Sequence, residues 1–177
     1  MNFFLFSGIF VGFLVQSIFG FAASIFAFPL ILLVKNFAAA HAILSIFYLI
    51  FSAILLPKNW RDVDFSIFKK LFFGTFFGFL CGAQILLNFD SFFLKKFFGA
   101  TIIFYVFWQI LAPKKIKISE KFGPIFGFCG GFFSAVFAFS GPFFIIFAHQ
   151  KISSPRILRA TIIAILSVVN FLRAPIF

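Results

Sequence analysis

The sequence predicts an all-α polytopic membrane protein made of two inverted repeats. Each repeat opens with a broken or re-entrant helical hairpin, and the second repeat is incomplete. Three observations lead to this fold class. Of the 177 residues, 63% are hydrophobic and only 11% are charged, whereas soluble domains carry roughly a quarter charged residues. The charged residues fall between long apolar runs, and two of these runs are too long and too rich in Gly and Pro for one straight helix.

The apolar runs predict the membrane-crossing helices. Runs without Asp, Glu, Lys or Arg cover residues 1–34, 36–57, 71–89, 97–113, 122–150 and 160–172. A helix needs about 20 mostly apolar residues to cross a hydrocarbon core of about 30 Å. We therefore expect single crossings at 37–57, 71–89, 92–112 and 157–177. The net charge of +11 belongs to the connections, where Lys and Arg face anionic headgroups. It does not indicate a nucleic-acid partner.

Two of the runs are expected to be hairpins. As one helix, the run 3–34 would extend about 48 Å. It is interrupted by Gly and Pro, and so is the run 122–150. Broken backbone at membrane depth is stable only where protein covers it or where it lines a water-filled cavity. The interruptions are Gly8, Gly12, Gly20 and Pro29 in the first run, and Gly123, Pro124, Gly127, Gly130, Gly131, Gly141 and Pro142 in the second.

The distribution of Lys and Arg favours this topology. If both long runs crossed once, the two sides of the membrane would hold 8 and 6 positive residues in their connections. If both are hairpins, the loops 57–70, 113–121 and 149–159 share one side with 11 positive residues, against 3 opposite. Cytoplasmic loops carry the excess of Lys and Arg. The N-terminus is therefore expected outside, and 113–121 is expected to be a cytoplasmic loop.

A hairpin returns the chain to the side from which it entered, and three crossings then bring it to the other side. A second copy therefore begins at the opposite face of the membrane. The first repeat would cover residues 1–112 and the second would cover 122–177, with one hairpin and one span. Inverted repeats are the usual plan of secondary transporters. Two spans of the second copy are then missing, as expected for a C-terminally truncated chain. Association into a homo-oligomer is one way to replace them.

Polar residues inside the runs are the candidate site. They are Gln16, Ser17 and Ser24 in the first hairpin and Ser134 and Ser140 in the second. In Ser140-Gly141-Pro142 we expect the Ser side chain to cap a half-helix that has Pro in its first turn. The free N–H groups of such a helix start favour an anion.

The positions of the acidic residues also favour an anionic substrate. Cation transporters and proton relays generally place carboxylates within the membrane, and all four acids of this chain lie in connections. An anionic substrate is therefore favoured, although a neutral one would also need no carboxylate. The acids are Asp62, Asp64, Asp90 and Glu120.

Two arginines have two interpretations each. Arg173, with Ser167 and Asn170 before it at three-residue spacing, is a functional candidate as an intramembrane cation, or it reaches the outer interface with its charge. Arg159 is a second candidate, for which a solvated loop cation is the better interpretation.

Other features receive structural interpretations. Gly74, Gly78 and Gly82 form a small-residue stripe for close helix packing. Cys81 and Cys129 have no C-x-x-C spacing and no His partners, so neither a metal site, a redox pair nor another cofactor is expected. His41 and His149 stand at the edges of runs, where an interfacial His needs no special role. Trp60, Tyr48, Tyr105 and Trp108 are expected to be interfacial anchors or packing residues.

Two motifs resemble those of the TauE/SafE sulfite exporter family, in the right order and over nearly the whole chain. The first is Val15-Gln16-Ser17-Ile18-Phe19-Gly20-Phe21 followed by Phe28-Pro29-Leu30. The second is Gly127-Phe128-Cys129-Gly130-Gly131, then Phe139-Ser140-Gly141-Pro142, then Arg159-Ala160-Thr161.

The resemblance implies a permease that moves small sulfur-containing anions, such as sulfite or organosulfonates, across the cytoplasmic membrane, usually as an exporter. By motif position it implies substrate-related residues at Gln16, Gly20, Pro29, Ser140, Gly141, Pro142 and Arg159. The alternative is a membrane subunit without transport of its own, or an inactive truncated fragment. A membrane enzyme is disfavoured, because the chain offers neither an in-membrane acid nor a His–acid pair.

Overall fold

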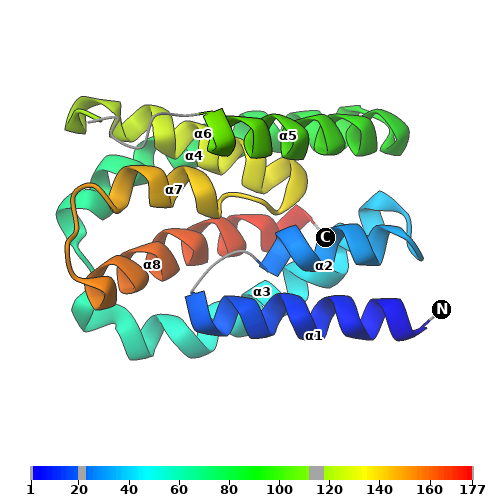
Figure 1. The fold of residues 1–177 in the computed structure, drawn as a ribbon, viewed down its shortest axis with the longest axis horizontal. Coiled ribbons are helices and arrows are strands. Elements are labelled where there is room, and N and C mark those ends of the chain that lie inside the picture. The colour runs from blue at the N-terminus through cyan, green and yellow to red at the C-terminus, as the bar shows by residue number, and fades with distance from the viewer. Residues whose placement is uncertain (1, 20–22, 112–117, 177) are drawn as a thin grey trace.

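The computed structural model of the chain describes residues 2–19, 23–111 and 118–176, and every regular element in these ranges is a helix (Figure 1). The expected all-α class is therefore confirmed. The helices are α1 (Asn2–Phe19), α2 (Ala23–Leu32), α3 (Phe37–Asn59), α4 (Phe65–Asn88), α5 (Ser91–Leu111), α6 (Gly123–Phe137), α7 (Gly141–Ala148) and α8 (Pro155–Arg173), with 3-10 turns η1 (Trp60–Asp62), η2 (Glu120–Phe122) and η3 (Ala174–Ile176).

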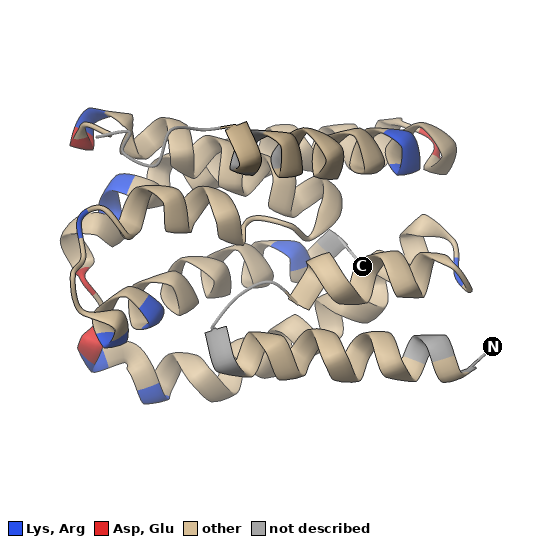
Figure 2. Cartoon of the chain, in the orientation of Figure 1, with Lys and Arg blue, Asp and Glu red and all other residues tan. Residues whose placement is uncertain are grey.

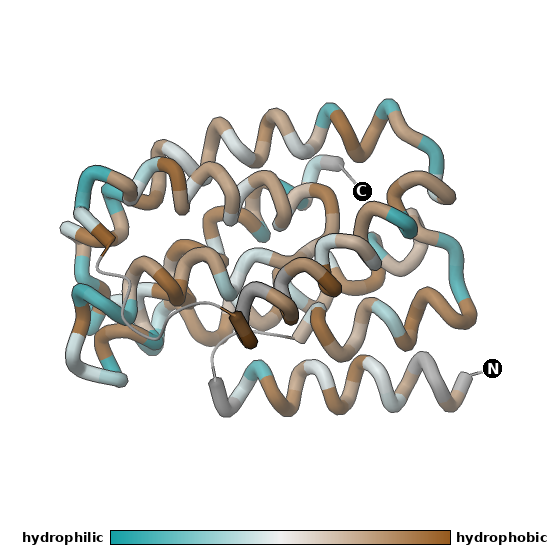
Figure 3. The backbone as a smooth tube through the Cα atoms, turned by 45° about the horizontal axis from the view of Figure 1, so that its top comes forward, coloured by the Kyte–Doolittle hydropathy of each residue, from teal (hydrophilic) through white to brown (hydrophobic). Residues whose placement is uncertain are grey.

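The helices form a bundle with the surface of a membrane protein. Among the described residues, three helical segments are long and apolar enough to cross a bilayer, namely Phe37–Asp62, Phe65–Asn88 and Pro155–Arg173. Large apolar side chains lie on the outside, such as Phe73 at 65% exposure and Phe104 at 68%. Charged residues gather at the two ends of the bundle (Figure 2), and hydrophobic residues fill the lengths of the helices between them (Figure 3). Such a belt suits the hydrocarbon core of a bilayer.

Each of the two long apolar runs contains two helices instead of one. Figure 1 shows that α1 and α2 run in opposite directions, so α1 begins at the end of the bundle where α2 finishes. The pair α6 and α7 is arranged in the same way, and begins and finishes at the opposite end of the bundle. The division of the chain into two inverted repeats stays a prediction.

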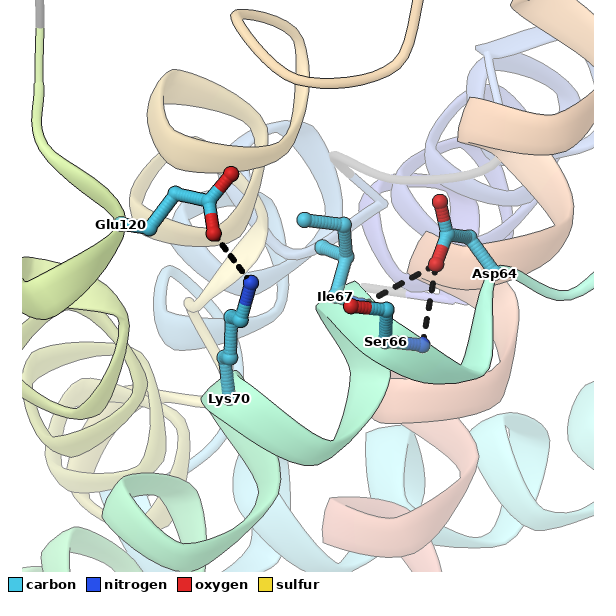
Figure 4. Close-up of polar contacts among 5 residues, drawn as sticks. All are labelled: Asp64, Ser66, Ile67, Lys70 and Glu120. Atoms are coloured by element: carbon cyan, nitrogen blue, oxygen red, sulfur yellow. Dashed lines mark hydrogen bonds and ion pairs between the residues drawn. The ribbon is translucent and has the colours of Figure 1, made fainter.

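The turn between α3 and α4 shows how a charged end is built. The predicted span began at residue 71, but α4 begins at Phe65 because Asp64 caps it. The Asp64 carboxylate accepts hydrogen bonds from the backbone N–H groups of Ser66 (2.9 Å) and Ile67 (3.1 Å) (Figure 4). Lys70, one turn further on, forms an ion pair with Glu120 of η2 (Figure 4). Of the predicted basic loop 113–121, residues 113–117 lie outside the described residues.

Helices α4 and α6 touch through their glycines. A Cβ atom added at Gly74 would lie 1.9 Å from the carbonyl oxygen of Pro124, and one at Gly78 would lie 2.0 Å from that of Phe128. In return, a Cβ at Gly131 of α6 would lie 2.1 Å from the carbonyl oxygen of Thr75. The two backbones are in direct contact, as small residues permit in membranes. The packing role predicted for the glycine stripe is confirmed.

Candidate functional site

A small buried pocket lies where the starts of α2 and α7 approach each other. Its volume is about 20 Å³, which is room for about one water molecule. Six of the lining residues carry polar side chains, and none of the lining residues is acidic or basic. The lining residues are Gln16, Ser24, Tyr48, Ser134, Ala138, Ser140, Gly141, Leu166 and Asn170.

The turn between α6 and α7 places the first residue of α7 at this pocket. Ala138 ends α6 in the left-handed region (φ 56°), and its N–H group donates to the carbonyl of Ser134 at 2.9 Å. The chain then reverses, and α7 begins at Gly141, which lines the pocket. The N–H groups of a first helical turn have no partner within the helix and carry a partial positive charge.

Ser140 departs from its expected role. Its hydroxyl makes no capping hydrogen bond at the start of α7, so the expectation of a Ser cap is wrong. With a φ of −136° and a ψ of −19°, this residue lacks the extended conformation that N-cap residues typically adopt. Its carbonyl accepts a hydrogen bond from the N–H of Phe143 at 3.2 Å. The side chain lines the pocket with 3% exposure.

Gln16 connects the two halves of the first helical pair. Its side-chain oxygen accepts a hydrogen bond from the backbone N–H of Ala23, the first residue of α2, at 3.3 Å. The side chain is buried and lines the pocket. Because the oxygen is engaged, Gln16 can offer its amide nitrogen, a hydrogen-bond donor. The start of α2 thereby reaches the pocket as well, with Ser24 in its first turn.

Arg173 is a buried cation beside the pocket. It is 1% exposed, so the alternative in which its charge reaches the interface is wrong. Its Nη2 atom donates to the carbonyl and, at 2.7 Å, to the hydroxyl of Ser134, and its guanidinium lies 5.8 Å from the ring centre of Tyr48. The Nε and Nη1 atoms have no hydrogen-bond partner among the residues that the structure describes. A buried charge without a counter-charge is costly unless a partner binds.

Helix α3 presents a polar face to α8 that the sequence analysis missed. His41, Ser45, Tyr48 and Ser52 follow one another at spacings of four, three and four residues, and all are buried. Such spacing puts side chains on one helix face. Asn170 of α8 donates to the Ser52 hydroxyl at 2.8 Å. The interfacial interpretation of His41 is wrong, because His41 is fully buried, whereas Tyr48 is a packing residue of the core, which was one of its two interpretations. The spacing along α3 was the signal that could have found this polar face.

The remaining predicted residues lie apart from the pocket or beside it. Arg159 donates to the backbone carbonyl of Ser17 at 2.8 Å, where both are exposed. This carbonyl belongs to the last turn of α1, which a cation stabilises. Pro29 lies within α2 away from its start, and Pro142 is buried in the first turn of α7. Gly20 lies outside the described residues.

The acidic side chains are engaged at the ends of the bundle. Asp62 accepts from Arg156 at 2.8 Å, and Asp90 accepts from the N–H of Phe93 at 2.7 Å. The hydrogen bond and charge of Lys70 hold the pKa of the Glu120 carboxyl below its ordinary value. In the part of the chain that is described, no three His, Cys, Asp or Glu side chains are grouped to hold a metal ion. The pocket itself is lined by hydrogen-bond donors at two helix starts, and Arg173 lies beside it, bound to the lining residue Ser134.

Comparison with known proteins identifies the family. No curated protein and no solved structure matches the chain. The family model described as sulfite exporter TauE/SafE matches residues 4–177, which is nearly the whole length. The match includes both pairs of short helices and every helix that lines the pocket. The chain therefore belongs to the sulfite exporter TauE/SafE family of membrane transporters.

Proposed function

We propose that the protein is a secondary transporter that exports small sulfur-containing anions, such as sulfite or organosulfonates, across the cytoplasmic membrane. One observation carries the proposal: a pocket lined by no carboxylate is bordered by two helix starts and by a buried arginine, two of whose nitrogens have no hydrogen-bond partner among the described residues. The family match supports transport as the activity. The nature of the pocket supports an anion as the substrate.

The chemistry of the lining residues suits a sulfur oxyanion. Sulfite and sulfonates present several oxygens that share a negative charge, and each oxygen accepts hydrogen bonds. Serine and tyrosine hydroxyls and amide nitrogens donate them, and the guanidinium of Arg173 can offer two N–H groups to one such headgroup. Substrate contacts are proposed for Gln16, Ser140, Gly141 and Asn170, which line the pocket, and for Arg173 beside it.

The volume of the pocket bears on the mechanism. About 20 Å³ holds one water molecule but no sulfonate, so the helices around the pocket must separate for the substrate to enter. We propose that the pairs α1–α2 and α6–α7 begin the two inverted repeats. Rocking of one repeat against the other would then open the pocket to each side in turn, as in other transporters with inverted repeats.

Flux in proteoliposomes tests this function. Purified protein is reconstituted, and the movement of radiolabelled sulfite and methanesulfonate down a gradient is compared with protein-free liposomes. We expect flux of at least one of the two anions, and none of tetramethylammonium. The double variant Ser140→Ala with Gly141→Leu should abolish it, because the leucine side chain fills the pocket.

The matched control is Ser153→Ala with Gly99→Leu. Ser153 is exposed in the connection before α8, and a Cβ at Gly99 meets nothing within 4 Å. This variant should transport like wild type. Absence of anion flux in the wild-type protein would contradict the proposed function. Normal flux in the pocket variant would show that the substrate does not pass through this pocket.

A further inference from the structure

His41 is a second ionisable residue in the buried interior. It lies in the second turn of α3 and is fully buried. Its ring packs against Phe28 of α2, with ring centres 6.0 Å apart at 87°, and against Phe37, with centres 6.3 Å apart. The imidazole also interacts with the backbone of Ala135 in α6. An ionisable side chain at such a place in a membrane protein is a functional candidate by default.

The surroundings of His41 connect it to the pocket. It begins the polar face of α3, on which Tyr48 lines the pocket. Between them, the hydroxyl of Ser45 donates to the carbonyl of His41 at 2.8 Å. On the other side, Ala135 is the neighbour of Ser134, which lines the pocket and holds Arg173. His41 thus lies two helical turns before Tyr48 on one face of α3, and its contact Ala135 adjoins Ser134 of the pocket.

The charged groups around His41 make its protonation depend on the pocket. From α8, Arg173 is bound to Ser134, the residue before the Ala135 that His41 contacts, so the guanidinium charge acts on the imidazole through the buried interior. From α2 and α6, the described contacts are the Phe28 ring and the Ala135 backbone, and the other titratable group of α3 nearby is Tyr48. A proton on His41 therefore repels Arg173 when the pocket is empty. A bound anion offsets this repulsion, and the coupling is reciprocal: the anion favours the proton, and the proton favours the anion.

We infer that His41 takes up a proton when the pocket binds its anion, so that one proton accompanies each anion across the membrane. This inference rests on the proposed function and names its coupling ion. The proton comes from water on the side to which the pocket is open, binds an imidazole nitrogen, and returns to water on the other side with the anion. Transport of a monovalent anion is then electroneutral, and its direction follows the sum of the anion and proton gradients.

Methanesulfonate is the right probe, because it carries no titratable proton near neutral pH and brings none of its own. Proteoliposomes with a pH-sensitive dye inside are given an inward methanesulfonate gradient without a pH gradient. We expect the lumen to become acidic in step with uptake of the labelled anion, at about one proton per anion. Binding in detergent should strengthen by roughly fivefold or more between about pH 8 and about pH 6.

The variant His41→Gln keeps a polar side chain but cannot take up the proton. It should lower the ratio of protons to anions at least fivefold and remove the pH dependence of methanesulfonate binding. The matched control is His149→Gln, since His149 is exposed beyond the end of α7.

The wild-type protein by itself can overturn the inference, so the result does not depend on the folding of the variant. Methanesulfonate uptake without acidification of the lumen would contradict proton coupling while leaving the transporter function intact. An unchanged ratio in His41→Gln would assign the proton to another residue. A complete lack of methanesulfonate and sulfite flux would instead contradict the proposed function, and the inference with it.

Discussion

Replacing Arg173 should weaken anion binding without lowering the stability of the protein. Within the described part of the chain, its buried guanidinium has no hydrogen-bond partner for Nε and Nη1, so it destabilises the empty protein while it is available to an anion. Arg173→Gln should weaken methanesulfonate or sulfite binding about a hundredfold, as for the loss of one partner of a buried charge pair. The thermal midpoint should stay the same or rise, because an uncompensated buried charge disappears.

The measurements are isothermal titration of the anion and a thermal melt in the same detergent. Arg173→Lys should bind with intermediate affinity, since a lysine keeps the charge without the planar fork. Arg156→Gln is the matched control, because Arg156 is exposed and pairs with Asp62 at the surface. A large fall in thermal midpoint together with unchanged anion affinity would make Arg173 a structural residue.

Glu120 offers a pH-dependent test at the charged end of the bundle. Lys70 lowers the pKa of Glu120 by hydrogen bonding and by its charge. Since the folded-state pKa lies below the unfolded one, the contribution to stability is complete above the unfolded pKa and is lost as pH falls through the folded one. The thermal midpoint of Glu120→Gln should therefore lie slightly below that of wild type at neutral pH, and the two should converge in acid. A difference that does not change with pH would exclude this ion pair as its source.

At the scale of elements, the reversal between α6 and α7 contains a strained residue. Ala138 has a positive φ of 56°, a region that glycine adopts without the cost of a Cβ atom. Ala138→Gly should stabilise the protein by about 0.5 kcal/mol, or at least leave it unharmed. In contrast, Ala135→Gly within α6 should destabilise it by about 1 kcal/mol. Thermal or denaturant unfolding of the two variants measures the contrast, and a loss of stability in Ala138→Gly equal to that in Ala135→Gly would contradict the argument.

The contact between α4 and α6 should tolerate no side chain at its centre. A Cβ at Gly78 would lie 2.0 Å from the carbonyl oxygen of Phe128, and backbone cannot move aside as a flexible side chain can. Gly78→Leu should therefore cost about 3 kcal/mol or more, at the upper end for overpacking. Gly99→Leu is the control, because space is open around that glycine. Equal yields of folded protein for both variants in a detergent-stability assay would show that the helices separate easily.

The sequence predicted the elements better than the contacts between them. The Gly and Pro content indicated that both long runs are interrupted, but most of the named positions are not the breaks. Helices continue through them, with Gly8 and Gly12 inside α1, Pro29 inside α2, and Gly127, Gly130 and Gly131 inside α6. The glycine stripe of α4 predicted its packing. The capping of α7 by Ser140 was predicted wrongly, since the hydroxyl's environment depends on the left-handed residue Ala138 before it. The burial of Arg173 and His41 could not be decided from their positions in the runs, because it depends on tertiary packing: α2 and α6 cover His41, and α3 and α6 cover Arg173.

At the scale of the whole molecule, polarity is arranged in three zones. Both ends of the bundle carry the solvated charges and their partners (Figure 2), the flanks are apolar (Figure 3), and the interior holds a narrow polar region around Arg173. The acids are confined to the ends, so the interior field is positive where α2 and α7 begin. This arrangement favours the entry of anions over cations.

The orientation of this arrangement in the membrane is the last prediction. The end with the turn from α3 to α4 and the connection from α7 to α8 is expected in the cytoplasm, because these loops hold most of the Lys and Arg. In a background without Cys81 and Cys129, cysteines at Asn2 and Asn36 should both react with an impermeant maleimide added outside cells. Cysteines at Ser119 and Ser153, at the other end, should react only after the cells are opened. Labelling of Asn2 and Asn36 from opposite faces would exclude the α1–α2 hairpin, whereas labelling of both only from inside would keep the hairpin and invert the protein.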